Sequence, residues 1–162
     1  MGVESGTRYA KSGDVHVAYA ASGESQPDLV LVPDGAIPIE AMGELPAFAR
    51  FIQRLERLCR VIRYDRRGTG MSDPPTPGNP PTLEQWAEDG ILVLDALGSR
   101  RTALLGMAEG GFVVALLAAM YPERVHSLTL VNATPGISSE PFRRWGSAAG
   151  ALDRLRALID SS

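Results

Sequence analysis

The chain has very little cysteine and histidine and no long apolar segment. Its single cysteine, Cys59, excludes an internal disulfide and a cysteine metal cluster. No group of histidines and carboxylates has the spacing of metal ligands, so we expect no metal and no other cofactor. No apolar run approaches the ~20 residues of a membrane span, and the N-terminus lacks the apolar core of a signal peptide. These absences predict a cytoplasmic protein without a membrane partner.

Neither sign of charge is in large excess. The net charge is -3, with 44% hydrophobic and 22% charged residues over 162 positions, which is ordinary for one folded domain. Such a balance gives no reason to expect nucleic acid as a partner. The basic residues are spread along the chain, and we interpret the pairs Arg66-Arg67, Arg100-Arg101 and Arg143-Arg144 as solvated charges rather than a phosphate site.

Apolar periodicity predicts strands that alternate with helices. The two segments around Gly13 and Asp14 are expected to pair as an antiparallel hairpin. Thr82 and Gln85 have the spacing of a capping box, which opens a helix. The last helix is apolar on every side and is therefore expected to lie under a sheet. The predicted strands are 8–11, 15–20, 28–33, 60–64, 101–105 and 127–132, and the predicted helices are 46–58, 82–98 and 109–121.

A glycine-rich turn joins the strand at 101–105 to this apolar helix. It reads Gly106-Met107-Ala108-Glu109-Gly110, followed by Gly111. The glycines suit a sharp turn that brings the backbones of strand and helix together. The frame resembles Gly-x-Ser-x-Gly, the nucleophile elbow of α/β-hydrolases, in which a serine hydroxyl points into the active site. Ala108 takes the place of that serine, and its methyl group cannot attack a substrate.

A second motif, Asp65-Arg-Arg-Gly-Thr-Gly-Met-Ser72, follows the strand at 60–64 and resembles the Asp-x-Arg-Gly-x-Gly-x-Ser turn of the same superfamily. We expect the Asp65 carboxylate and the Ser72 hydroxyl to satisfy backbone donors around Gly68 and Gly70. Residues 7–135 thus resemble the first half of an α/β-hydrolase. Within the superfamily the chain looks most like the hydrolase-like domain that precedes class III adenylate cyclase domains in some bacterial proteins, because their elbow often reads Gly-x-Ser-Glu-Gly-Gly.

The resemblance implies an α/β fold with an N-terminal antiparallel hairpin and a mostly parallel sheet flanked by helices, without the last strands. Residues 1–135 are expected to be a partial hydrolase core, and 136–162 the start of the lid, helical or poorly ordered. In the superfamily the acid and the histidine of the triad follow the nucleophile, and both would lie beyond the strand at 127–132. His16 and His126 are the two histidines, and neither stands where the family places its base.

The resemblance also locates an oxyanion hole at the amide of Glu109 and an amide near Asp34-Gly35. Two interpretations of Asp34 remain open. Its side chain either turns inward, where its charge would oppose a developing oxyanion, or turns outward into a local turn hydrogen bond.

These expectations predict a hydrolase-like protein that has lost catalysis and acts, if at all, as a binding or regulatory module. The alternative is a carboxylic-ester hydrolase that a partner chain completes or that uses a non-standard site. In the family a seventh strand covers the sixth, so the strand Leu128-Thr-Leu-Val-Asn132 is expected to leave an exposed edge. Such an edge favours a homodimer, a partner strand or aggregation.

Overall fold

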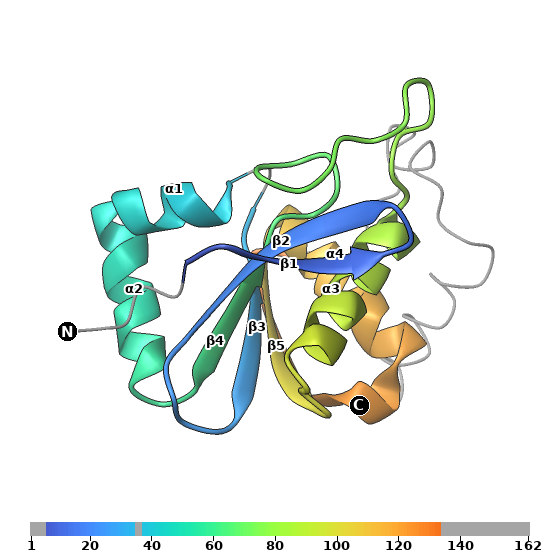
Figure 1. Cartoon of the computed structure of the whole chain (residues 1–162). Coiled ribbons are helices and arrows are strands. Elements are labelled where there is room, and N and C mark those ends of the chain that lie inside the picture. Colours follow the sequence, from blue (N-terminus) through green and yellow to red (C-terminus); the bar gives the residue numbers. More distant parts are fainter. Residues whose placement is uncertain (1–5, 35–36, 134–162) are drawn as a thin grey trace.

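The computed structural model describes residues 6–34 and 37–133, and within them six strands form one sheet (Figure 1). The order across the sheet is β1-β2-β4-β3-β5-β6. β1 pairs antiparallel with β2, and β2 with β4, whereas β4, β3, β5 and β6 run parallel. The strands are β1 Arg8–Ser12, β2 Val15–Ser22, β3 Asp28–Val32, β4 Arg60–Tyr64, β5 Thr102–Met107 and β6 Val125–Val131.

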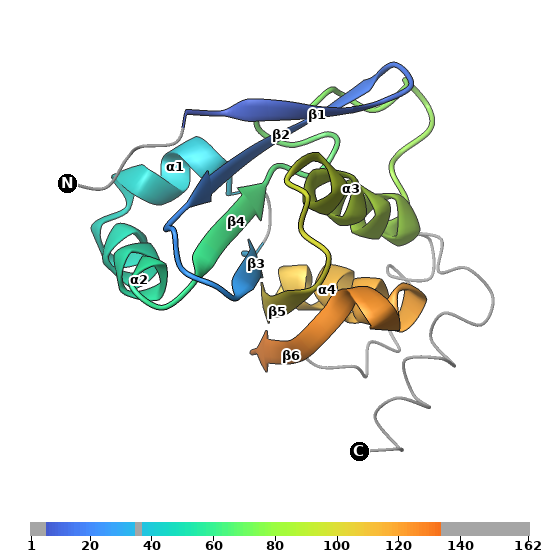
Figure 2. The same cartoon turned by 60° about the horizontal axis from the view of Figure 1, so that its bottom comes forward.

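Helices cover both faces of this sheet. One hydrophobic cluster joins the sheet to α3 and α4, and a second joins it to α1 and α2 (Figure 2). Because both faces are covered at its centre, β3 and β5 are nearly continuous apolar runs, as buried parallel strands usually are. The helices of the described residues are α1 Ile39–Glu44, α2 Pro46–Glu56, α3 Leu83–Ala96 and α4 Glu109–Met120, and a 3-10 turn spans Pro122–Arg124.

The predicted α/β architecture is confirmed: an antiparallel hairpin leads into a mostly parallel sheet flanked by helices. The capping box is confirmed as well, since the Thr82 hydroxyl accepts from the Gln85 amide and the Gln85 side chain accepts from the Thr82 amide. Helix α1 is absent from the helices predicted from the sequence. Its six residues are too few to show helical periodicity, and the buried Asp65 carboxylate holds its first amide, that of Ile39.

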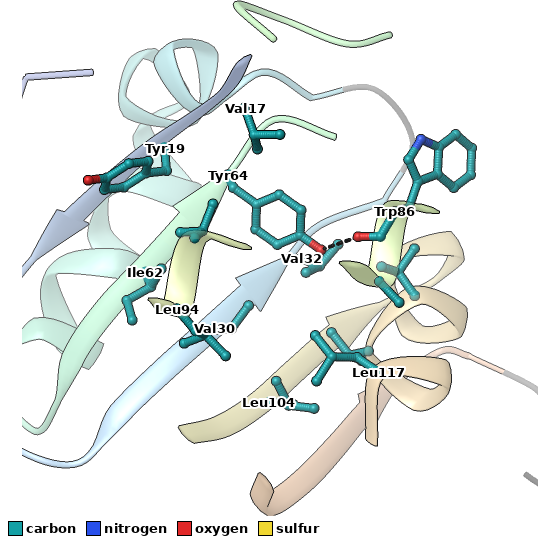
Figure 3. Close-up of a cluster of buried hydrophobic side chains, with 14 of the residues drawn as sticks. Val17, Tyr19, Val30, Val32, Ile62, Tyr64, Trp86, Leu94, Leu104 and Leu117 are labelled. Carbon is teal, nitrogen blue, oxygen red and sulfur yellow. Dashed lines mark hydrogen bonds between the residues drawn. The ribbon is translucent and has the colours of Figure 1, made fainter. Parts of the chain in front are cut away.

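The larger core lies between the sheet and the pair α3–α4 (Figure 3). Val30, Val32, Ile62 and Leu104 project from three neighbouring parallel strands toward α3 and α4. Full burial of each such side chain stabilises the fold by about 1.5–3 kcal/mol. The one polar group that this cluster presents from β4, the Tyr64 hydroxyl, donates to the Trp86 carbonyl of α3 at 3.1 Å. Burial raises the pKa of that hydroxyl far above its ordinary value.

The structure also bears on the cysteine and on the search for a membrane-spanning helix. Cys59 is buried, and burial raises the pKa of its thiol. Over 6–34 and 37–133 no helix combines the length and apolarity needed to cross a membrane. The predicted lid at 136–162 lies outside the described residues, as does Gly35 of the expected oxyanion loop.

Candidate functional site

The elbow turn is built from a single residue between β5 and α4. Ala108 has φ 45° and ψ −116°, which places a residue with a Cβ in the left-handed half of φ space. Such a conformation costs about 1–3 kcal/mol and persists only where the surroundings impose it. Here the Ala108 amide donates to the Val131 carbonyl of β6 at 2.8 Å, and its carbonyl accepts from the Gly111 amide at 3.1 Å. The strained turn that the resemblance predicts at this position is therefore present, with an alanine at its centre.

The glycines of the elbow allow α4 to lie directly on the sheet. A Cβ on Gly110 would overlap the carbonyl oxygens of Val32 and Pro33 at the end of β3. A Cβ on Gly106 would overlap Val114, and one on Gly111 would overlap the Ala133 side chain. Close backbone approach of this kind is available only to glycine. These contacts fix the N-terminus of α4 at the carboxyl end of β3 and β5.

Asp34 lies against this N-terminus. The Glu109 amide donates to Asp34 Oδ1 at 3.3 Å, across 75 residues of sequence. The parallel register that pairs Val32 with Gly106 explains the contact, because it brings the carboxyl ends of β3 and β5 together. A carboxylate is favourable at a helix N-terminus, where the macrodipole is positive. The Asp34 carboxylate thus accepts from the amide that the resemblance assigns to the oxyanion hole, whereas residues 35–36, the neighbours available for a local turn, lie outside the described residues.

The Glu109 side chain is held from another direction. Its Oε2 lies 3.6 Å from a guanidinium nitrogen of Arg66, a side chain that is 5% exposed. The Arg66 guanidinium in turn lies 4.4 Å from the centre of the Trp86 ring, in a cation–π contact. Arg66 thus connects the loop after β4, helix α3 and the first turn of α4. The expectation that the pair Arg66-Arg67 is solvated was wrong.

Arg67 is also an internal charge. Its Nε lies 3.0 Å from Asp89 Oδ1, and its backbone amide donates to Asp89 Oδ2 at 3.1 Å. Hydrogen bonds with Asp89 raise the pKa of the guanidinium, although partial burial opposes the shift. Asp89 lies among the apolar residues of α3 that face the core. That position was the one signal in the sequence, since a buried carboxylate requires a partner.

The turn after β4 is organised by Asp65 and Ser72. The Asp65 carboxylate accepts from the amides of Ile39 and Met71, each at 2.9 Å, while the Ser72 hydroxyl donates to the Asp65 carbonyl and accepts from the Ala18 amide. Gly68 and Gly70 have positive φ, and a Cβ on Gly70 would overlap the Asp65 carboxylate. Burial raises the pKa of Asp65 above its ordinary value, although the two amide hydrogen bonds oppose the shift. The turn seats α1 and the Arg66-Arg67 pair.

Neither histidine reaches the elbow. His16 Nδ1 lies 3.0 Å from Asp73 Oδ2, and its strand β2 is separated from β5 by β4 and β3, about 14 Å at the usual strand spacing. His126 stands at the amino end of β6, beside the start of β5 and therefore at the opposite end of the sheet from Ala108. The described residues also bring no three histidine, cysteine or acidic side chains into a metal-binding group.

The elbow region thus combines a methyl group, one backbone amide held by a carboxylate, and an arginine–glutamate pair. A serine-type hydrolase needs a nucleophile with an oriented base within hydrogen-bond reach. Over the described ranges, with their gaps at 35–36 and beyond 133, the structure brings no such pair to Ala108.

Comparison with protein families gives a match to the alpha/beta hydrolase fold over residues 40–155. Among curated proteins, the chain is 35% identical over 147 residues to the putative carbamate hydrolase RutD of Azorhizobium caulinodans, which covers 90% of this chain and 48% of that protein. The chain therefore spans about half the length of this relative.

Solved structures give the same picture. A hydrolase from Pseudomonas aeruginosa superposes with a TM-score of 0.71 at 31% identity, covering 95% of this chain and 53% of that one. The enol-lactonase from Burkholderia xenovorans superposes with a TM-score of 0.67 at 30% identity, covering 79% of this chain and 47% of that one. The similarity extends over the sheet, both helical layers and the elbow.

Proposed function

Because the chain belongs to the α/β-hydrolase fold family, we propose that it is a member that has lost catalysis and acts as a binding or regulatory module. The observation that carries the proposal is the elbow itself. Ala108 keeps the strained turn and offers no atom that could attack a substrate.

The state of the oxyanion donor supports the same proposal. In the family the amide that follows the nucleophile stabilises the negative charge of the tetrahedral intermediate. Here the equivalent amide, that of Glu109, already donates to the Asp34 carboxylate. A second negative charge at this position would be repelled by the first. The loss matters because electrostatic stabilisation of the oxyanion usually contributes more to the rate of acyl transfer than any other single effect.

Restoring the serine tests the proposal. We expect the Ala108→Ser variant, like the unmodified chain, to hydrolyse p-nitrophenyl acetate no faster than buffer and to resist labelling by a fluorophosphonate. The physical reason is the missing base, since neither histidine lies within reach of position 108. An active α/β-hydrolase assayed in parallel is the positive control. Ester turnover by the unmodified chain would contradict the loss of catalysis.

A second candidate is a hydrolase that uses a non-standard site or is completed by a partner chain. The observation in its favour is the exposed Asp34 carboxylate beside the elbow, where it could take a proton from water. Carboxylic esters are the first substrates to try, followed by carbamates and lactones, the compounds named for two of the relatives. This candidate requires activity that Asp34→Asn abolishes and that Asp14→Asn, in the distant β1–β2 turn, leaves intact.

Within the family we infer a place in the branch that precedes adenylate cyclase domains. The support is the Glu-Gly-Gly that follows Ala108, which resembles the elbow of that branch. A regulatory role for a domain without catalysis is compatible with such a neighbour. The reading frame that follows Ser162 tests this inference. We expect it to encode a cyclase domain, and an unrelated sequence there would contradict the inferred branch.

A further inference from the structure

Helix α2 presents three arginines on one exposed side. Arg50 and Arg54 are four residues apart and Arg57 follows three residues later, so the three lie along the same side of the helix. Arg57 is the C-cap residue and continues the helical turn, with φ −72° and ψ −19°. All three are exposed, whereas the apolar side of α2 packs toward the sheet. We call these three side chains the arginine stripe.

The arginine stripe has no partner within residues 6–34 and 37–133. Among those residues, its guanidinium groups form no hydrogen bond, ion pair or aromatic contact. Other arginines of the chain are used internally, since Arg60, Arg67 and Arg124 each bind a carboxylate. The single acidic residue of α2, Glu56, interacts electrostatically with Arg63 of β4. The charge of the stripe is therefore not balanced by the helix that carries it.

Helix stability does not account for the stripe. Arg54 and Arg57 stand at the C-terminal end of α2, where a cation is favourable to the helix dipole. Arg50 stands a turn earlier, where this benefit has faded, and it is repelled by Arg54 because like charges four residues apart destabilise a helix. Such a row of cations is complementary to negative charge on another molecule.

Acidic residues on the neighbouring helix limit the shape of that molecule. α1 packs against α2 and carries the exposed carboxylates of Glu40 and Glu44. A nucleic-acid duplex or an anionic bilayer would bring its negative charge against these carboxylates as well. A membrane-binding segment also carries more cations as a rule, about four to eight. The charge pattern therefore favours a narrow anionic partner that covers the stripe alone.

Exposed leucines at the two ends of the helix indicate a protein partner. Leu58, which directly follows Arg57, is 71% exposed, and Leu45, the N-cap residue, is 46% exposed. Apolar side chains of this size can pack against a protein surface but gain little from a phosphate backbone. The stripe extends over roughly 10 Å at the helical rise of ~1.5 Å per residue. Carboxylates spaced three and four residues apart on a second helix match this length and period.

We propose that the arginine stripe binds an acidic helical segment of another protein, whose carboxylates meet the three guanidinium groups and whose apolar side chain covers Leu58. Each guanidinium can donate two parallel hydrogen bonds to one carboxylate. The surface lies on α2, at the left margin of the molecule in Figure 1, and α2 packs on β4, which β3 and β5 separate from β6. The proposal does not rest on the proposed function, because the stripe contains no residue of the elbow.

A designed helical peptide tests the proposal. The probe is a fluorescein-labelled, stapled alanine-based helix with glutamates at positions i, i+4 and i+7 and a leucine at i+8, and binding to the full chain is followed by fluorescence anisotropy. We expect saturable binding that weakens as the salt concentration rises. The same peptide with glutamine in place of glutamate is the matched control and should not bind. Absence of binding by the glutamate peptide, or equal binding by the glutamine peptide, overturns the proposal.

Charge reversal at the centre of the stripe locates the binding surface. Arg54→Glu should weaken binding of the glutamate peptide about tenfold or more, because an attractive contact becomes a repulsive one. A peptide with lysine at its central position should bind this variant more tightly than it binds the unmodified chain. Arg100→Glu, at an exposed arginine before β5, is the matched control and should leave binding intact. Equal losses in the two variants overturn the proposal, as does tighter binding of duplex DNA or phosphatidylserine vesicles than of the peptide.

Thermal unfolding separates a role in binding from a role in folding. Arg50→Gln removes the repulsion with Arg54 and substitutes a residue of similar helix propensity. We expect the midpoint of unfolding to stay the same or to rise while the peptide binds less tightly. A lower midpoint would mean that Arg50 serves the fold, and it would overturn the assignment of the stripe to a partner.

Discussion

At the residue level, Ala108 adopts the strained backbone conformation of the elbow but carries only a methyl group. The turn is held from outside, by the Val131 carbonyl of β6 and by the first turn of α4. Its strained φ of 45° does not depend on a serine side chain. An alanine can therefore occupy the turn, and its strain remains as a local destabilisation.

This strain can be measured by Ala108→Gly. Relief of a positive φ is worth about 1–3 kcal/mol, and the added freedom of glycine in the unfolded chain removes roughly 0.5–1 kcal/mol of that. We expect the free energy of unfolding in urea to rise by about 1 kcal/mol. Ala115→Gly, inside α4 and buried, is the matched control and should lower it by about 1 kcal/mol or more. A loss of stability in Ala108→Gly would show that the conformation is not strained.

At the scale of the element, the elbow depends on how closely α4 approaches β3. Gly110→Ala would place a Cβ against two backbone carbonyl oxygens, which cannot move aside as a flexible side chain would. We expect the free energy of unfolding to fall by about 3 kcal/mol, the upper end for overpacking. Thermal unfolding followed by circular dichroism measures it.

The control for this prediction is Gly43→Ala in α1. A Cβ there would meet no atom within 4 Å, and alanine is the better helix former by up to about 1 kcal/mol. The control should be neutral or slightly stabilising. Equal effects of the two substitutions would mean that helix propensity, rather than the contact with β3, decides the result.

Elements also differ in how far the sequence predicts them. α3 has a capping box and a periodic apolar stripe, and α4 is apolar all round, so both were predicted close to their observed bounds. α1 has neither signal, because its start is fixed by Asp65, 26 residues further along the chain. Local patterns thus predict the helices whose signals lie within their own sequence, and miss the one whose start a distant carboxylate holds.

At the scale of the whole molecule, ion pairs inside the sheet make stability depend on pH. Asp28 of β3 is 3% exposed and accepts two hydrogen bonds from the Arg60 guanidinium of β4, at 2.7 and 2.6 Å. Burial alone would raise the pKa of Asp28, but the hydrogen bonds with Arg60, aided by other partners, lower it below its ordinary value of 3.8. The folded state therefore holds this carboxylate ionised at a pH where the unfolded chain takes up a proton.

Asp28→Asn tests this linkage. The contribution of Asp28 is complete above pH 3.8, the ordinary value, and is lost as the pH falls through the lower pKa of the folded state. The variant should be less stable at neutral pH and should lose less stability than the unmodified chain on acidification below pH 3.8. Urea unfolding at a series of pH values measures both. Arg60→Gln removes the partner and should likewise reduce the loss of unfolding free energy below pH 3.8. If both variants lost as much stability on acidification as the unmodified chain, the linkage would be ruled out.

The sequence alone predicts the six strands, the helices other than α1, the place of the elbow and the alanine at its centre, because apolar periodicity, glycines and a single side chain are local properties. Which charged side chains meet depends on the tertiary structure. The exposed Asp34 carboxylate accepts from the Glu109 amide across 75 residues, and the buried Asp89 carboxylate binds Arg67 across 22. No local pattern links such positions. Asp34 meets Glu109 because the parallel strands β3 and β5 end at one edge of the sheet, where α4 begins. Arg67 meets Asp89 because the loop after β4 lies against the middle of α3.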